Sequence, residues 1–387
     1  MPDSRPEPRA LLEKLVAFDT TSAKTNIPLV EFVTDYLAGH GIASELVPTP
    51  DGLKASLFAT IGETGKSGIG LSGHTDVVPV EGQQWGTDPF TLTERDGKLY
   101  GRGTCDMKGF LACVLAMAPN FKARALKTPI HIVFSYDEEV GCTGVRPMIA
   151  ELGARLTRPR LVIVGEPTNM GIVDSHKGAT RFRTTITGRE AHSSMAHIGV
   201  NAIHYAGVLI AELARIEEEL RVGRQDERFT PPYTTLQIGL IEGGRAQNIV
   251  PRYCSFSWEI RALPGYDVKT ATDRFESYVR TRCLPSMQAI GRDTGIETEA
   301  VNGVPAFHSG ATSEAVSLAL KLMGQNATHA VSYATEAGLF QGGGCDSVIC
   351  GPGHIEQAHR PDEFLAASEL DRCMAFLVRL AEWAEAN

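Results

Sequence analysis

The spacing of apolar residues divides the first part of the chain into alternating helical and extended segments. Apolar residues between positions 8 and 19 recur at helical spacing, and residues 27–38 repeat this pattern before Gly39. A helix of small and apolar residues is expected at 109–117. Short, uninterrupted apolar runs predict buried strands at 55–60, 68–73, 130–135 and 161–165. Strands that alternate with helices indicate a layered α/β domain.

The pattern changes after Gly178. Residues 179–188 alternate as a half-buried strand, and residues 201–220 then have the spacing of a long helix. A second helix is predicted at 267–281, and further strands at 234–240, 253–261 and 297–301. In chain order this is strand, helix, strand, strand, helix, strand, which is the split βαβ arrangement of a ferredoxin-like unit.

From Ser309 the first pattern returns, with helices at 312–323 and 362–385 and a strand at 348–350. We therefore predict one α/β domain that is interrupted by an inserted α+β domain. The expected boundaries are 1–178 and 303–387 for the first domain and 179–302 for the insertion. A chain of 387 residues is long enough for two domains.

Composition narrows the class of protein and its partners. Hydrophobic residues make up 43% and charged residues 21%, which excludes a disordered or fibrous chain. The net charge of −9 argues against a general binder of nucleic acid. No apolar run reaches the roughly 18 residues of a transmembrane helix, and the N-terminal segment lacks the apolar core of an export signal. The eight cysteines are scattered, so we expect reduced thiols in a cytoplasmic protein.

Side chains that can bind a metal occur in four short segments, each after a predicted strand or at the start of a helix. These side chains are His74, Asp76, Asp106, Glu138, Glu139 and Glu166. Ligands of open α/β sheets bind beyond the carboxyl ends of the strands, so the four segments have a reason to converge. Several carboxylates in one place would be a costly concentration of negative charge without a cation. The sequence therefore predicts a site for a divalent metal.

Neighbouring residues within these segments suit different tasks. In an extended segment Asp76 faces the same side as His74 and can fix the tautomer of its ring. Glu138 and Glu139 point to opposite sides, so one carboxylate can bind a metal while the other transfers a proton. Residues 351–363 offer two more histidines, at positions 354 and 359, and spacing does not decide which of them faces the metal.

Two competing motifs do not change this interpretation. Residues 68–73 match G-x-G-x-x-G, but a dinucleotide fingerprint needs a helix directly after the glycines, and His-Thr-Asp-Val-Val-Pro follows here. Cys345 and Cys350 lack the second pair of thiols of a zinc ribbon, so we expect them in the core.

Together the motifs resemble the di-zinc family of aminoacylases, deacylases and carboxypeptidases over essentially the whole chain. The motifs that carry the resemblance are Gly73–Pro79, Trp85–Phe90, Gly97–Gly109, Asp137–Glu139, Gly165–Thr168 and His176–Gly178. Residues 85–100, 335–337 and 351–363 are most similar to the members that deacetylate N2-acetylornithine. The resemblance implies a metal-dependent amide hydrolase of arginine biosynthesis that acts on a small N-acyl amino acid. Acetylcitrulline, succinyl-diaminopimelate and dipeptides are the alternative substrates, and a non-catalytic protein on this scaffold is the alternative of another class.

The resemblance also implies a role for each matching residue of the metal site. Asp76 would orient His74, and Glu138 would be the general base. Two zinc ions, with cobalt or manganese as substitutes, would be bound by five residues: His74 and Glu166 at one ion, Glu139 and His359 at the other, and Asp106 at both. The choice of His359 follows from the family, in which this histidine precedes an x-Pro-Asp-Glu segment.

The inserted domain would be a lid through which two copies form a homodimer. His192 matches a lid histidine that reaches into the partner's active site and stabilises the oxyanion. Asn248 and Arg261 match substrate-binding positions, and an arginine suits bidentate capture of a carboxylate. Thr335 and Glu336 are expected at the substrate, where charge matching makes Glu336 a contact for the distal ammonium of acetylornithine, directly or through water.

Overall fold

The computed structural model describes residues 7–387 and divides them into two compact units. The first unit ends at Asp174 and resumes for His308–His329 and Thr335–Asn387, and the second comprises Ser175–Phe307 and Ala330–Ala334. The range predicted for the insertion, 179–302, lies within Ser175–Phe307. The segment expected to lack an export signal falls partly in residues 1–6, which lie outside the described residues.

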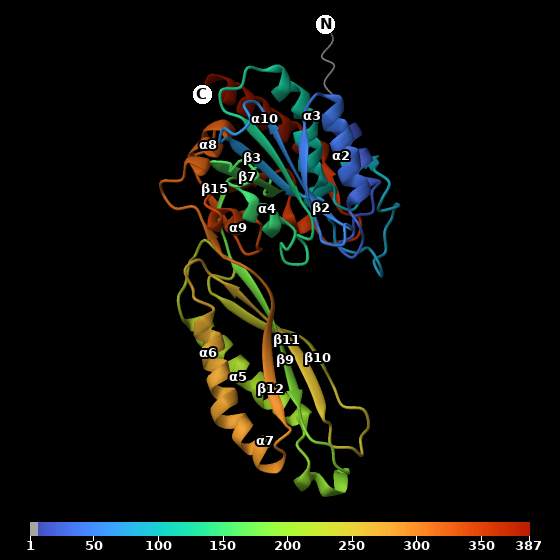
Figure 1. The fold of residues 1–387 in the computed structure, drawn as a ribbon, viewed down its shortest axis with the longest axis vertical. Helices are drawn as coiled ribbons and strands as arrows, with labels where there is room; N and C mark the ends of the chain where they lie inside the picture. The colour runs from blue at the N-terminus through green and yellow to red at the C-terminus, as the bar shows by residue number, and fades with distance from the viewer. Residues whose placement is uncertain (1–6) are drawn as a thin grey trace. The chain divides into compact units, whose positions relative to one another are not determined.

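The described residues contain a mixed sheet of nine strands, most of which lie in the first unit, and this confirms the predicted α/β class (Figure 1). Strand β3 is parallel to both β6 and β7, and β7 is parallel to β15. The strand order is β1 (Ser44–Pro48), β2 (Ala55–Ile61), β6 (Ile130–Ser135), β3 (Ile69–His74), β7 (Leu161–Pro167), β15 (Asp346–Gly351), β8 (Val173–His176) and β13 (Phe307–His308), with β14 (His329–Val331) paired to β8.

Different helices cover the two faces of this sheet. Alternate strand residues such as Ile69 and Leu71 point to one face of the sheet, where they form a large apolar core with several helices. These helices are α1 (Pro8–Val16), α2 (Ile27–Gly39), α3 (Gly109–Ala123), α8 (Glu314–Met323) and α10 (Ala367–Ala386). Ser72 lies between the core-facing residues, and its hydroxyl meets Glu336, directly before α9 (Ala337–Gly342). The opposite face therefore carries α9 and its neighbour α4 (Val145–Glu151).

The helix predicted at 362–385 begins later than expected. Phe364–Ala366 form strand β16, which pairs with β5 (Lys98–Tyr100) in a small sheet that also contains β4 (Thr93–Arg95). Helix α10 starts only at Ala367. A strand of three residues is too short to show its own periodicity, and its partner lies far away in the sequence.

The second unit has the predicted order of strands and helices. It contains β9 (Gly178–Thr187), α5 (Ala202–Val222), β10 (Thr235–Gly243), β11 (Tyr253–Ala262), α6 (Lys269–Tyr278), α7 (Leu284–Ile290) and β12 (Gly295–Val304). The strands form an antiparallel sheet in the order β10-β11-β9-β12 (Figure 1). Phe182 and Trp258 stack at 4.3 Å between ring centroids, and Phe275 of α6 packs against Trp258. These aromatic contacts join the sheet to its helices in one apolar core.

All eight cysteines lie in the described part of the chain, where they are buried and free of disulfides. Cys345 and Cys350 are thus in the interior, as expected. No helix in residues 7–387 is long and apolar enough to cross a membrane.

Candidate metal centre

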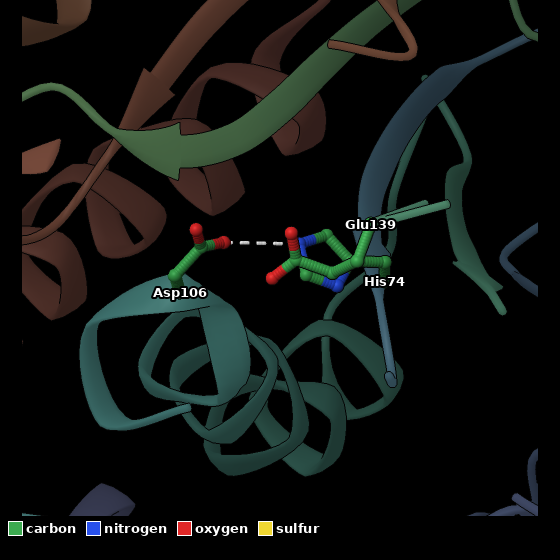
Figure 2. A group of neighbouring side chains, drawn as sticks. All are labelled: His74, Asp106 and Glu139. Atoms are coloured by element: carbon green, nitrogen blue, oxygen red, sulfur yellow. Dashed lines mark hydrogen bonds and ion pairs between the residues drawn. The ribbon is translucent and has the colours of Figure 1, made fainter. Parts of the chain in front are cut away.

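His74 is the last residue of β3, and its imidazole faces carboxylates from two other segments (Figure 2). Its Nε2 atom lies 3.0 Å from Oδ1 of Asp106 and 3.7 Å from Oε1 of Glu166. Glu166 approaches because Ser72 pairs with Val164 in the parallel register of β3 and β7, so the residues two positions later leave the sheet at the same level. The strand-end rule therefore brings a histidine and a glutamate together, as the sequence indicated.

Asp106 lies between two pairs of polar side chains. Its Oδ1 atom faces His74, while its Oδ2 atom lies 3.4 Å from Nε2 of His359. The same nitrogen of His359 is 3.0 Å from Oε2 of Glu139. Asp106 is thus shared by a pair formed by His74 and Glu166 and by a pair formed by Glu139 and His359.

Burial and crowding change the protonation of this cluster. Burial, reinforced by the charge of Glu139, raises the pKa of Glu138 to about 8. Burial, reinforced by the charge of Asp106, raises the pKa of Glu139 to about 7. Hydrogen bonds to Asp106 and Glu139 raise the pKa of His359 to about 11. The cluster therefore holds protons where a cation can bind instead.

The chemistry of the donor set fits divalent cations. Ligand atoms of His74, Asp106 and Glu139 lie within 4.8 Å of one another, and so do those of His74, Glu138 and Glu166. Mixed imidazole and carboxylate donors are typical of zinc, cobalt and manganese sites. These five residues and His359 form the side-chain group that we call the ligand cluster.

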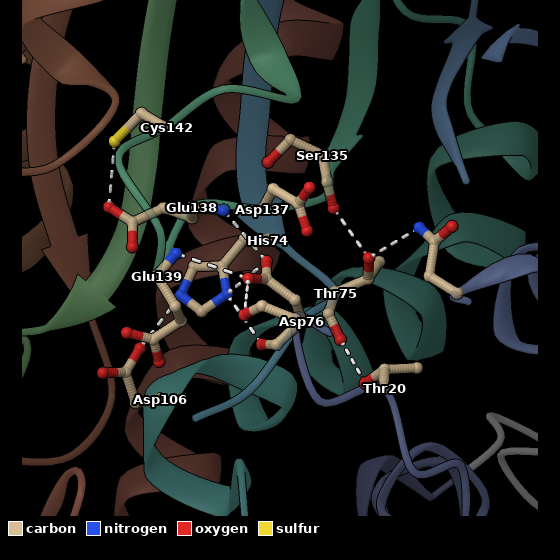
Figure 3. Close-up of polar contacts among 12 residues, drawn as sticks. Thr20, His74, Thr75, Asp76, Asp106, Ser135, Asp137, Glu138, Glu139 and Cys142 are labelled. Carbon is tan, nitrogen blue, oxygen red and sulfur yellow. Dashed lines mark hydrogen bonds and ion pairs between the residues drawn. The ribbon is translucent and has the colours of Figure 1, made fainter. Parts of the chain in front are cut away.

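Asp76 connects the ligand cluster to the neighbouring loop (Figure 3). Its carboxylate accepts hydrogen bonds from the backbone amides of Glu138 at 3.1 Å and Glu139 at 3.3 Å, and from the Ser22 hydroxyl at 2.7 Å. Nδ1 of His74 lies 2.9 Å from the carbonyl oxygen of Asp76 and 3.5 Å from its Oδ1 atom. The nearer contact of the ring is thus with the backbone of Asp76 rather than with its carboxylate. The carboxylate also holds the loop with the two glutamates, which the sequence did not indicate.

Glu138 lies beside the other carboxylates and has one hydrogen-bonded oxygen. The thiol of Cys142 donates a hydrogen bond to its Oε1 atom at 3.2 Å (Figure 3). Its Oε2 atom is not held by that bond. A carboxyl group with a pKa near neutrality is effective as a general base or acid.

Glu363 is a supporting residue that sequence reasoning missed. Its buried carboxylate accepts hydrogen bonds from the backbone amides of Gly103, Cys105 and Asp106 at 2.9–3.1 Å. Nη1 of Arg102 lies 2.7 Å away and offsets the charge. Glu363 therefore fixes the turn that presents Asp106. In the sequence, residues 361–363 indicated only that His359 is the metal ligand. Nothing in them predicted a contact with residues 102–106.

The structure separates the two histidines that spacing could not distinguish. His359 contacts Asp106 and Glu139, whereas Nδ1 of His354 accepts a hydrogen bond from the amide of Glu356 at 3.2 Å. The carbonyl oxygen of His354 accepts a hydrogen bond from the thiol of Cys105. Only His359 of these two lies beside the other members of the ligand cluster.

Thr335 and Glu336 are buried on the face of the sheet that carries α9. The hydroxyl oxygen of Thr335 accepts a hydrogen bond from the amide of Ala337. Oε1 of Glu336 accepts a hydrogen bond from Ser135 at 2.5 Å, and its Oε2 accepts one from Ser72 at 3.2 Å. Both carboxylate oxygens of Glu336 thus have partners within the protein.

The remaining predicted residues, His192 for the oxyanion and Asn248 and Arg261 for the substrate, belong to the second unit. His192 precedes a short 3-10 helix, and its neighbour Ser193 donates its amide hydrogen to the carbonyl of Asn248 at 3.0 Å. Nε of Arg261 donates to Oε1 of Glu259 at 2.8 Å. His192 and Asn248 are therefore neighbours within this unit, and the roles of all three residues stay predictions.

Comparisons with known proteins point in the same direction as the ligand cluster. Residues 70–383 match the model of peptidase family M20/M25/M40. The chain is 36% identical over 390 residues to an acetylornithine deacetylase of Myxococcus xanthus, covering 98% of both chains. It is 34% identical over 368 residues to an acetylornithine deacetylase of Proteus mirabilis, covering 95% of this chain and 92% of that one.

Solved structures share the fold at lower identity. A metallo-carboxypeptidase of family M20 from Sulfolobus solfataricus superposes with a TM-score of 0.78 at 18% identity, covering 99% of this chain and 100% of that chain. Human carnosine dipeptidase 1 gives a TM-score of 0.75 at 17% identity, covering 98% of this chain and 97% of that chain. At these identities the likeness establishes the fold and not the substrate.

The protonation of the ligand cluster predicts a pH-dependent response to cations. Glu138 has a pKa of about 8 against an ordinary value of 4.5, so the native cluster binds more protons than the unfolded chain between these pH values. Stability without metal should therefore fall as the pH rises through this window. Because a cation displaces these protons, Co²⁺ added to chelator-treated protein should raise the melting temperature more at pH 8 than at pH 6.

Scanning calorimetry measures this difference. Asp106→Asn is the control, because it removes the shared ligand and should abolish most of the stabilisation at both pH values. An increase of equal size at pH 6 and pH 8 in the unmodified chain would contradict this description of the cluster.

Proposed function

The chain belongs to peptidase family M20/M25/M40 and is a hydrolase of that family, and on this premise we propose that it removes the acetyl group from N2-acetyl-L-ornithine to give ornithine and acetate. The observation that carries the proposal is the 36% identity to an acetylornithine deacetylase over 98% of both chains. We further propose that the reaction serves arginine biosynthesis in the cytoplasm.

The ligand cluster supports a site for two cations, and we propose zinc as the metal. His74 and Glu166 would bind one ion, Glu139 and His359 the other, and Asp106 both, in line with the contacts of its two oxygens. When bound, the cations supply Lewis acidity, which lowers the pKa of a water molecule and polarises the acyl carbonyl.

Glu138 would transfer the proton in this reaction. It takes a proton from the attacking water and returns it to the amine nitrogen as the C–N bond breaks, so that the products are acetate and the free amine. Asp76 holds the backbone amides of residues 138 and 139, and this contact orients the base toward the ligand cluster. Cys142 occupies one oxygen of Glu138, so the other remains for the water.

We also propose that the second unit forms a homodimer in which His192 of each copy donates to the oxyanion in the other copy's site. Exposed apolar side chains on its sheet support self-association, since Leu240 is 70% exposed, Ile241 56% and Tyr253 44%.

Arg261 and Asn248 would bind the carboxylate of the substrate. Glu259 accepts from Arg261 and lies 3.1 Å from Arg181, so its charge is shared between two arginines.

A substrate panel tests the proposed reaction. The zinc-loaded protein should hydrolyse N2-acetylornithine in preference to acetylcitrulline, other acetyl amino acids, succinyl-diaminopimelate and dipeptides, and a chelator should abolish the activity. Release of amine is measured with a ninhydrin assay. Chelator-sensitive preference for another of these compounds would contradict the proposed substrate and retain the class of reaction, and activity that resists the chelator would contradict both.

Glu138→Gln tests the assignment of the base. This variant keeps the size of the side chain and removes the proton acceptor, so kcat should fall by about 10²–10⁴-fold while the bound metal is retained. Elemental analysis measures the metal beside the kinetic assay. Glu356→Gln, at an exposed carboxylate, is the control and should leave kcat unchanged. Near-normal turnover of Glu138→Gln would show that another group is the base.

Mixing two inactive variants tests the role of His192. His192→Ala should lose about 10²–10³-fold in kcat, the usual effect of one oxyanion donor. A mixed dimer of His192→Ala with Glu138→Gln would contain one complete site, because the second copy supplies the histidine to the first. Subunit exchange should therefore restore a large part of the lost activity. Failure to restore it, in dimers shown to be mixed by native mass spectrometry, would contradict action between copies.

A further inference from the structure

Glu336 is a buried acidic residue outside the ligand cluster. It contacts β3, which ends at His74, and β6, which leads to the loop with Glu138. Its side chain is only 1% exposed. It directly precedes α9 and lies on the sheet face opposite the large helical core. Burying a carboxylate in this position costs free energy unless hydrogen bonds to the carboxylate offset the cost.

The contacts of Glu336 join β3 to β6. Ser135 is the last residue of β6 and donates to Oε1, while Ser72 of β3 donates to Oε2. The two strands are parallel, and Ser135 is the register partner of His74. One carboxylate therefore bridges the strands where His74 leaves one and the chain toward Glu138 leaves the other.

A second contact on the same level strengthens this connection. The carbonyl of Ser135 accepts hydrogen bonds from the amide of Thr75 at 2.9 Å and from its hydroxyl at 2.7 Å (Figure 3). The residue after β3 is thus held against the carbonyl of Ser135, while the hydroxyl of Ser135 binds Glu336. The separation between His74 and the loop of residues 137–139 depends on these contacts.

We propose that Glu336 is a positioning residue, which fixes the distance between His74 and Glu138 by clamping β3 to β6, and that it does not bind the ammonium group of the substrate. Both oxygens of the carboxylate already accept serine hydroxyls. A substrate ammonium would have to displace these bonds inside a buried site. The kinetic test of this inference, described next, rests on the proposed deacetylase function.

The test compares two substrates that differ in the distal ammonium group. Acetylornithine carries this group, and N-acetylnorvaline has the same three side-chain carbons without it. For a positioning residue, Glu336→Leu should lower kcat for both substrates by a similar factor of about 10–100, since misplacement of catalytic groups costs rates of this order. KM should change less than about twofold for either substrate.

Conservative and partner variants make the test specific. Glu336→Gln should retain most of the activity, because an amide can accept from one serine and donate to the other hydroxyl. Ser72→Ala and Ser135→Ala should each lower kcat for both substrates in the same direction, and adding Ser135→Ala to Glu336→Leu should cause little further loss. These serine variants carry the test if Glu336→Leu does not fold.

The opposite result is equally definite. If Glu336 binds the ammonium, Glu336→Gln and Glu336→Leu will both raise KM for acetylornithine and leave N-acetylnorvaline unaffected. The serine variants would then have little effect. This pattern would overturn the positioning role.

A spectroscopic measurement separates failure of this inference from failure of the proposed function. Co²⁺ bound to the chelator-treated protein gives visible absorption bands that depend on ligand geometry. The clamp predicts altered bands and weaker Co²⁺ binding in Ser135→Ala, measured by competition with a chromogenic chelator. Unchanged bands and affinity would overturn the clamp. If the unmodified protein hydrolyses neither substrate, the deacetylase proposal fails while this measurement still decides the role of Glu336.

Discussion

Repulsion between buried carboxylates is the constraint on which the rest of the first unit depends. Asp106, Glu138, Glu139 and Glu166 lie around His74, and burial, reinforced by the charges of their neighbours, raises the pKa values of the three glutamates. Such a group repels itself in a medium of low dielectric constant, so the fold must hold it in place by other contacts. Cations relieve this repulsion, and protons do so when cations are absent.

The contacts that hold the cluster come from three further carboxylates. Asp76 binds the amides of residues 138 and 139, Glu363 binds the amides around Asp106, and Glu336 joins β3 to β6. Each of them fixes a different segment, and each accepts hydrogen bonds from backbone amides or serine hydroxyls. Asp76 thereby adds negative charge behind the ligands, whereas Arg102 offsets the charge of Glu363. This arrangement makes a divalent cation still more favourable at the front.

The sequence predicted features that depend on local patterns, and it missed contacts between segments that are distant in the chain. Strand ends and alternation are local properties, so the convergence of His74, Asp106 and Glu166 followed from short patterns and the direction of parallel strands. The choice of His359 over His354 needed a family resemblance, because the loop between them, with one short 3-10 helix at Ile355–Gln357, has no periodicity that predicts where either side chain points. The contact between Glu363 and the turn before Asp106 depends on two segments more than 250 residues apart in the chain.

We propose that the ligand cluster is one site for two divalent cations, which share Asp106 as a ligand. Elemental analysis of the purified protein after equilibrium dialysis against Zn²⁺ tests it most directly, with Asp106→Ala measured in parallel. We expect two ions per chain in the unmodified protein and the loss of both high-affinity ions in the variant. One ion or none in the unmodified protein, or two ions retained without Asp106, would contradict it.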